Sequence, residues 1–131
     1  MSKTIFLAAI LISTALSADD DYFVPNQLLE CAALFGWVSR KGTDNEKKLK
    51  AKEFLNMYFG AAKDLSSNKY ALETFKIKLG QLENKIYSDP KDAPLYLQRE
   101  ISRCSDPVNL GDRVVSELNI LLHNKGNSSS E

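Results

Sequence analysis

The sequence is poor in the residues on which most metal and cofactor chemistry depends. Its 131 residues include one histidine and two cysteines, and basic and acidic side chains are equal in number, at 17 each. With one histidine and two cysteines that we expect to be oxidised, no set of soft ligands reaches the three or four that a zinc site requires. We therefore expect no metal and no cofactor. Without net charge, the protein lacks the long-range attraction that draws basic proteins to nucleic acids and anionic lipids, so neither is an expected partner.

No catalytic motif accompanies the single histidine. His123 lies in the last turn of a predicted helix, where the helix dipole favours a cation. A Ser-His-Asp triad or a Cys-His dyad needs an imidazole whose orientation is fixed by a rigid part of the fold. The sequence also has no glycine-rich phosphate loop and no Gly-x-Ser-x-Gly. A carboxylate pair, such as Glu30 with Glu53 or Glu100, would do acid–base work only if buried together, and no pattern indicates that. The sequence therefore predicts a protein that is not an enzyme.

Residues 1–18 have the features of a cleaved signal peptide. Lys3 gives a positively charged start, an apolar run follows, and small residues that suit signal peptidase end the segment. The alternative is an uncleaved membrane anchor, but the run ends before Asp19 and is shorter than the roughly 20 apolar residues that a span needs. We expect cleavage after Ser17 or Ala18, export to the periplasm or the cell exterior, and no stable membrane insertion.

The two cysteines, Cys31 and Cys104, are far apart in the chain. In an oxidising compartment, two thiols in one small domain usually pair. A redox-active pair is the functional alternative, but the sequence lacks the Cys-x-x-Cys spacing typical of such pairs. We expect a structural disulfide, which would stabilise the fold by about 4 kcal/mol in the chain-entropy model.

Low glycine and proline contents, with frequent Leu, Ala, Lys and Glu, favour helices. Apolar residues recur at intervals of three and four along several segments, and no strand-period segment of useful length is present. The sequence predicts an all-α fold: a compact bundle of four to five helices in one domain, residues 19–125, followed by a disordered tail at 126–131. The first helix is expected at 26–41 and the last at 109–123.

Whether the second and third helices are separate stays open. Thr43 and Glu46 form a capping box that opens the second helix. The apolar stripes of the two helices are in phase, so that they could form one long helix. Ser66 and Ser67 are poor helix formers and good caps, which favours a break near Ser67.

The apolar arc of the helix at 26–41 is wider than one neighbouring helix covers, so that this helix is either central or partly exposed for binding. Candidate partner-contact residues widen or leave the apolar stripes, or belong to a run of lysines near the start of the second helix. They are Leu34, Trp37, Met57, Phe59, Lys47, Lys48, Lys50 and Lys52. The lysines oppose the helix dipole, which favours a role in binding, whereas the alternative is a solvated helix face diluted by acidic neighbours.

These observations favour an exported, non-catalytic protein that binds another protein of the envelope or exterior: a chaperone, an inhibitor, an immunity factor or an assembly accessory. In its signal, cysteine separation and helical content, the chain resembles small exported bacterial helical proteins with one long-range disulfide, including acid-stress chaperones of the periplasm. The alternative is a helical carrier of a small apolar ligand. A carrier would need an internal cavity lined by Phe35, Phe54, Tyr58 and Phe75, residues that otherwise form core.

Overall fold

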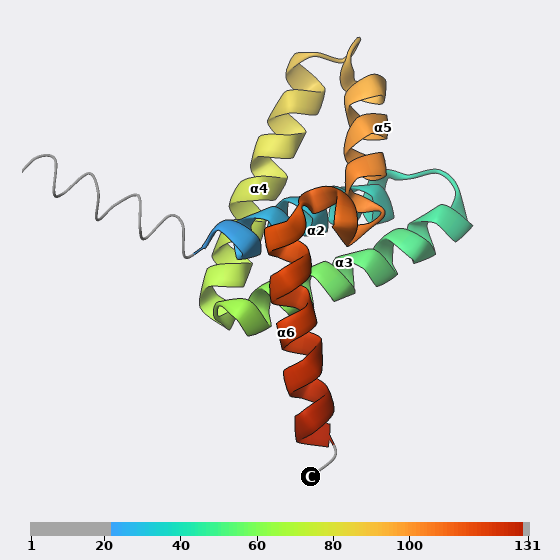
Figure 1. The fold of residues 1–131 in the computed structure, drawn as a ribbon. Helices are drawn as coiled ribbons and strands as arrows, with labels where there is room; N and C mark the ends of the chain where they lie inside the picture. Colours follow the sequence, from blue (N-terminus) through green and yellow to red (C-terminus); the bar gives the residue numbers. More distant parts are fainter. Residues whose placement is uncertain (1–21, 130–131) are drawn as a thin grey trace, which may run out of the picture.

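The computed structural model describes residues 22–129, and all regular structure in this range is helical (Figure 1). The predicted all-α fold is confirmed, while the predicted signal peptide at 1–18 lies outside the described residues. The elements are α2 (Phe23–Lys41), α3 (Asn45–Leu65), α4 (Asn68–Ser88), α5 (Ala93–Cys104), the 3-10 turn η1 (Pro107–Leu110) and α6 (Asp112–Ser129). None of these helices is long and apolar enough to cross a membrane.

Helix α2 lies at the centre, and α3, α4, α5 and α6 all contact it (Figure 1). Ten of its residues are buried, whereas α3 and α4 bury three each. A helix that is apolar on most of its sides is stable in water only when neighbours cover those sides. The wide apolar arc of α2 therefore reflects its central position rather than an exposed binding face.

Helices α3 and α4 are separate, as the serines between them indicate. The side chain of Ser67 accepts a hydrogen bond from the backbone N–H of Tyr70, at 3.0 Å, and so forms the N-cap of α4. The hydroxyl of Ser66 donates to the carbonyl of Ala62, at 2.6 Å, in the last turn of α3. The chain turns between these two bonds, which confirms the predicted break near Ser67.

The start of α3 differs from the prediction by one residue. Asp44, not Thr43, is the N-cap, and its carboxylate accepts hydrogen bonds from the backbone N–H groups of Glu46 and Lys47, at 2.9 and 3.3 Å. Both residue types cap helices well. A carboxylate has the further advantage of a favourable interaction with the positive end of the helix dipole.

The last helix begins and ends later than predicted. The residues before it form the separate turn η1, and Gly111 interrupts the helical backbone with a φ of 108°, a conformation that is strained for other residues. Helix α6 then starts at Asp112 and continues through Gly126, where the tail was predicted to begin, to Ser129. One glycine costs a helix only about 1 kcal/mol, so Gly126 does not by itself end it.

Candidate functional site

The predicted disulfide between Cys31 of α2 and Cys104 of α5 is confirmed, with the two Cα atoms 5.5 Å apart. Both residues are at most 1% exposed. The residues that precede them, Glu30 and Arg103, consequently lie close together, and their side chains form an ion pair at 3.5 Å. The disulfide therefore fixes both the position of α5 on α2 and the charged groups beside it.

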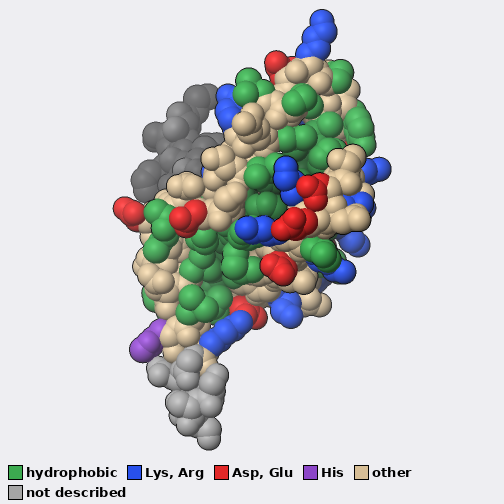
Figure 2. Space-filling model, turned by 90° about the vertical axis from the view of Figure 1, so that its right-hand side faces the viewer, with side chains coloured by type: hydrophobic (Ala, Val, Ile, Leu, Met, Phe, Trp, Pro, Cys, Tyr) green, Lys and Arg blue, Asp and Glu red, His purple; other side chains and the backbone are tan. Residues whose placement is uncertain are grey.

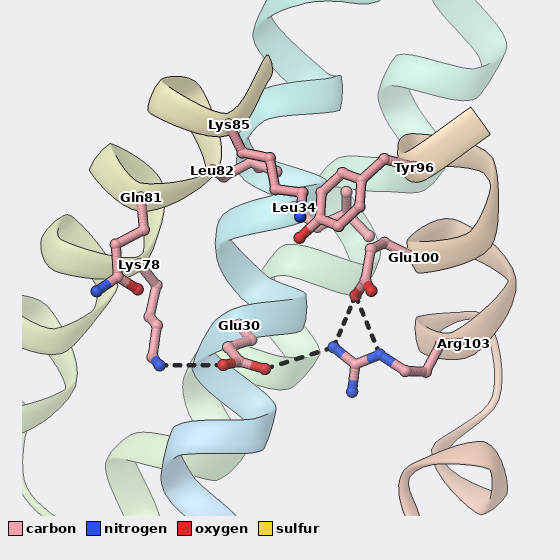
Figure 3. A pocket seen from close by; sticks show the side chains of 9 residues that line it. All are labelled: Glu30, Leu34, Lys78, Gln81, Leu82, Lys85, Tyr96, Glu100 and Arg103. Carbon is pink, nitrogen blue, oxygen red and sulfur yellow. Dashed lines mark hydrogen bonds and ion pairs between the residues drawn. The ribbon is translucent and has the colours of Figure 1, made fainter. Parts of the chain in front are cut away.

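A cleft of about 350 Å³ opens beside these groups, with α4 and α5 as walls and α2 as floor (Figure 3). We refer to it as the α4–α5 cleft. Its lining combines apolar and charged side chains from all three helices: Glu30, Leu34, Lys78, Gln81, Leu82, Lys85, Tyr96, Glu100 and Arg103. Residues that are far apart in the sequence thus meet in one small hollow.

Four of the charged side chains form a chain of ion pairs across the cleft (Figure 3). Lys78 Nζ lies 3.0 Å from one carboxylate oxygen of Glu30, and Arg103 contacts the other. Arg103 also donates from Nε and Nη2 to Glu100, at 3.0 and 2.8 Å. All four side chains are partly exposed, so each pair contributes at most about 1 kcal/mol. Together they link α4 to α2 through Lys78 and Glu30, and α2 to α5 through Glu30 and Arg103.

Lys85 is the remaining charged group of the cleft. Its ammonium lies over the ring of Tyr96, 4.5 Å from the centroid, and no carboxylate of the described residues lies within 4.0 Å of it. Burial raises the pKa of Tyr96, and the nearby carboxylates of Glu100 and Glu30 raise it further, while Arg103 lowers it. Tyr96 therefore keeps its proton at neutral pH and can donate a hydrogen bond.

The lining of the α4–α5 cleft includes two of the three carboxylates considered from the sequence, Glu30 and Glu100. It contains no serine, cysteine or histidine that could act as a nucleophile or its base. Glu30 and Glu100 do come together, but the guanidinium of Arg103 occupies the space between them. Glu53, the third carboxylate considered from the sequence, is exposed on α3 and does not line the cleft.

A buried tyrosine supports the disulfide from the α3 side. The hydroxyl of Tyr58 donates a hydrogen bond to the carbonyl of Cys104, and the side chain is buried. Burial raises the pKa of Tyr58 to about 12, the negative charge of Asp106 adds to this, and Arg103 opposes it. The folded protein thus stabilises the protonated, neutral form of the Tyr58 hydroxyl.

We expect the stability contribution of Tyr58 to be lost between pH 10 and about 12. The unfolded chain releases this proton at the ordinary tyrosine pKa of 10.0, whereas the folded protein keeps it to about 12, so rising pH favours the unfolded state in this window. The loss is on the order of 2 kcal/mol. Guanidinium unfolding of the wild type and of Tyr58→Phe should give free energies that converge above pH 10. An unchanged difference between them would contradict the buried hydrogen bond.

A second hollow of about 350 Å³, largely apolar, lies between α3 and α6, and we call it the α3–α6 groove. Its lining is Asn56, Met57, Tyr58, Gly60, Ala61, Pro107, Leu118, Leu121, Leu122 and Lys125. Met57 and Leu122 remain 48% and 65% exposed. A Cβ atom built on Gly60 would meet nothing within 4 Å, so the groove is open above this residue. Figure 2 shows apolar side chains gathered on this part of the surface.

The structure does not gather the eight candidate partner-contact residues on one surface. Met57 lines the α3–α6 groove, and Lys50 lies two turns earlier on the same face of α3. Lys48 and Lys52 line a different hollow, together with Arg40 from the end of α2. Lys47 is exposed but lines neither hollow.

The candidates on α2 lie in or against the core. Leu34 is only 3% exposed, so its expected exposure is wrong: its stretch of α2 packs against the neighbouring helices, and Leu34 forms part of the floor of the α4–α5 cleft. Trp37 is partly buried against the core, and its indole nitrogen has no hydrogen-bond partner among the described residues. Phe59 of α3 packs edge-on against Phe75 of α4, with the ring centroids 5.8 Å apart.

The groove also includes leucines of α6 that were not among the candidate partner-contact residues. Leu118, Leu121 and Leu122 have the helical spacing of core residues, but Leu122 is exposed and the other two are only partly buried. Ile120 is exposed as well. The apolar arc of α6 is wider than one neighbouring helix can cover. The apolar residues left uncovered are the sequence signal that could have identified the groove.

The four rings proposed to line a ligand cavity do not surround a common space. Phe35 and Phe54 stack on each other at 4.8 Å, and Tyr58 stacks on both, at 6.1 and 6.4 Å. These three rings pack against one another, as aromatic side chains do in a protein core, and leave no shared space between them for a ligand. Phe75 packs elsewhere, against Phe59. The arrangement required for a carrier of apolar ligands is therefore not the one found in the described residues.

Metal ligation and similarity to known proteins add no further assignment. Within residues 22–129, no group of three or more His, Cys, Asp or Glu side chains is placed to hold a metal ion. Comparisons of the chain with protein-family models, with curated proteins and with solved structures found no match.

Proposed function

We propose that the protein is an exported, non-catalytic interaction protein that receives one amphipathic helix of another protein in the α3–α6 groove. The supporting observation is an apolar hollow left open to solvent, with Met57 exposed on one wall and Leu122 on the other. A groove between two helices that exposes apolar side chains is typical of sites for a partner's helix.

The shape and charge of the groove favour this occupant. The small residues Gly60 and Ala61 form part of its lining, so that the backbone of a partner helix can approach closely. Lys125 is the one charged residue in the lining, and its ammonium is paired with Asp64 of α3 at 2.6 Å. The face of the partner helix that enters the groove is therefore expected to be uncharged. The volume of about 350 Å³ suits a few apolar side chains from one face of a helix.

The disulfide supports export. Disulfides persist in oxidising compartments outside the cytosol, and the signal-like segment at 1–18 gives the chain a route to such a compartment. We therefore place the partner among the proteins of the envelope or the cell exterior. A chaperone, inhibitor, immunity or assembly accessory role each requires such a partner.

Filling the groove should abolish partner binding without harming the fold. We expect Gly60→Leu to place a bulky side chain in the open space above α3, and to raise helix stability by up to about 1 kcal/mol because glycine is a poor helix former. Gly80→Leu on α4 is the matched control, since its Cβ also meets nothing within 4 Å and it does not line the groove.

Partner binding can be followed with a photo-crosslinking amino acid at Met57 in the native host, and with the same probe at the exposed Ile77 of α4. The proposal predicts one partner protein cross-linked from Met57 but not from Ile77, lost in Gly60→Leu and kept in Gly80→Leu. Retention of the partner in Gly60→Leu, or a product that contains two copies of this chain, would refute it.

A further inference from the structure

We infer that the α4–α5 cleft binds a small organic monocarboxylate, whose carboxylate contacts Lys85 and Tyr96 and whose apolar part lies on Leu34 and Leu82. The site is separate from the α3–α6 groove and does not depend on the proposed function. It rests on the balance of charges in the cleft, on two hydrogen-bond donors at its mouth that have no acceptor among the described residues, and on an apolar floor.

The charge balance favours an anion. The cleft contains three cationic and two anionic side chains. Both carboxylates, Glu30 and Glu100, are occupied by Lys78 and Arg103 at 2.8 to 3.5 Å. A cationic or zwitterionic ligand would have to displace these ion pairs. Lys85 is the cation left without a carboxylate among the described residues. A ligand anion can therefore pair with it without breaking an existing ion pair.

The donors at the mouth of the cleft fit a carboxylate. Lys85 reaches from α4 over the ring of Tyr96, which comes from α5, so the two side chains meet across the opening (Figure 3). The hydroxyl of Tyr96 has no hydrogen-bond partner among the described residues and keeps its proton at neutral pH. An ammonium and a neutral hydroxyl from two helices can each donate to one oxygen of a carboxylate.

The floor of the cleft indicates an organic ligand. Leu34 and Leu82 are both buried, yet they line the cleft. Contact with them favours a ligand that carries a short hydrocarbon part, which a hydrated inorganic anion lacks. The volume of about 350 Å³ lies at the low end of the range for small-molecule sites, so a chain of a few carbon atoms fits.

The test is a titration of the full chain, with its disulfide formed, by sodium hexanoate, followed by nitrogen–proton correlation NMR. We expect a Kd of about 1 mM, as suits a ligand of this size, with the largest shifts at the amides of Gln81, Lys85 and Tyr96. Hexylamine has the same hydrocarbon part and the opposite charge. Inorganic phosphate has the charge without the hydrocarbon part. Both should bind at least about tenfold more weakly than hexanoate.

Two lysine variants of α4 separate a specific site from general attraction by positive charge. Lys85→Gln should weaken hexanoate binding about tenfold, because it removes one charge-assisted hydrogen bond. Lys76→Gln removes the same charge from an exposed position outside the cleft and should leave the Kd unchanged. The inference fails if hexanoate causes no shifts in the cleft, if hexylamine or phosphate binds equally well, or if both lysine variants bind like the wild type.

Discussion

Reduction of the Cys31–Cys104 disulfide is expected to lower the free energy of unfolding by about 4 kcal/mol. The bond joins residues 73 positions apart, so the oxidised unfolded chain is restricted to a closed loop, and reduction returns that conformational entropy to the unfolded state. In a domain of this size, such a loss corresponds to a decrease in Tm of about 15 to 25 °C. It is a large share of the 5 to 15 kcal/mol by which domains are usually stable.

Thermal unfolding followed by circular dichroism measures this effect. Because both cysteines are buried, the protein should be unfolded in the presence of the reductant and then refolded before the measurement. The double variant Cys31→Ala with Cys104→Ala is the control. It should unfold at the low temperature of the reduced protein and should not respond to reductant. Equal Tm values for oxidised and reduced wild type would show that the bond does not stabilise the fold.

Truncation of Leu28 in the central helix is expected to destabilise the protein by about 3 to 5 kcal/mol. Leu28 of α2 is fully buried, in the cluster to which α3, α4 and α6 also contribute. Leu28→Ala removes its contacts and leaves a cavity that the surrounding helices cannot fully close, since they are held in place by the disulfide and by one another.

Leu122→Ala provides the comparison for Leu28→Ala, because it removes the same atoms from a side chain that is mostly exposed on α6. Its expected cost is within about 0.5 kcal/mol. Urea unfolding of the two variants should therefore give clearly different midpoints. Similar costs would mean that α2 is not the central element.

The helices could be predicted from the sequence because their signals are local. The serines at 66 and 67 indicated the break between α3 and α4, which the structure places there. The exchange of Thr43 for Asp44 as N-cap shows the limit of such signals. Thr43 and Asp44 are adjacent and have similar N-cap preferences, so a sequence pattern does not decide which of them caps the helix.

Burial could be predicted less well, because it depends on which helices lie beside each other. The apolar arc of α2 was visible in the sequence, but its width was equally consistent with an exposed face at Leu34. Leu122 has the helical spacing of a core residue, yet it is 65% exposed at the edge of the groove between α3 and the lower part of α6 (Figure 1). Apolar residues at helical spacing are thus buried in the core on α2 but partly open to solvent on α6.

The α4–α5 cleft was beyond sequence patterns for a related reason. Its ion pairs join Glu30 to Lys78 and to Arg103, 48 and 73 positions away, and neither separation has a helical period. One signal was available. Glu30 and Arg103 each precede a cysteine, so a predicted disulfide already implied that these opposite charges lie close together.

The position of the disulfide also determines how the protein would respond to a protease. All of α3 and α4 and nearly all of α5 lie inside the covalent loop, whereas η1 and α6 lie outside it. A single cut between Cys31 and Cys104 leaves both fragments attached, so a nicked molecule can stay assembled. A cut at Gly111 would instead release α6, and with it one whole wall of the α3–α6 groove.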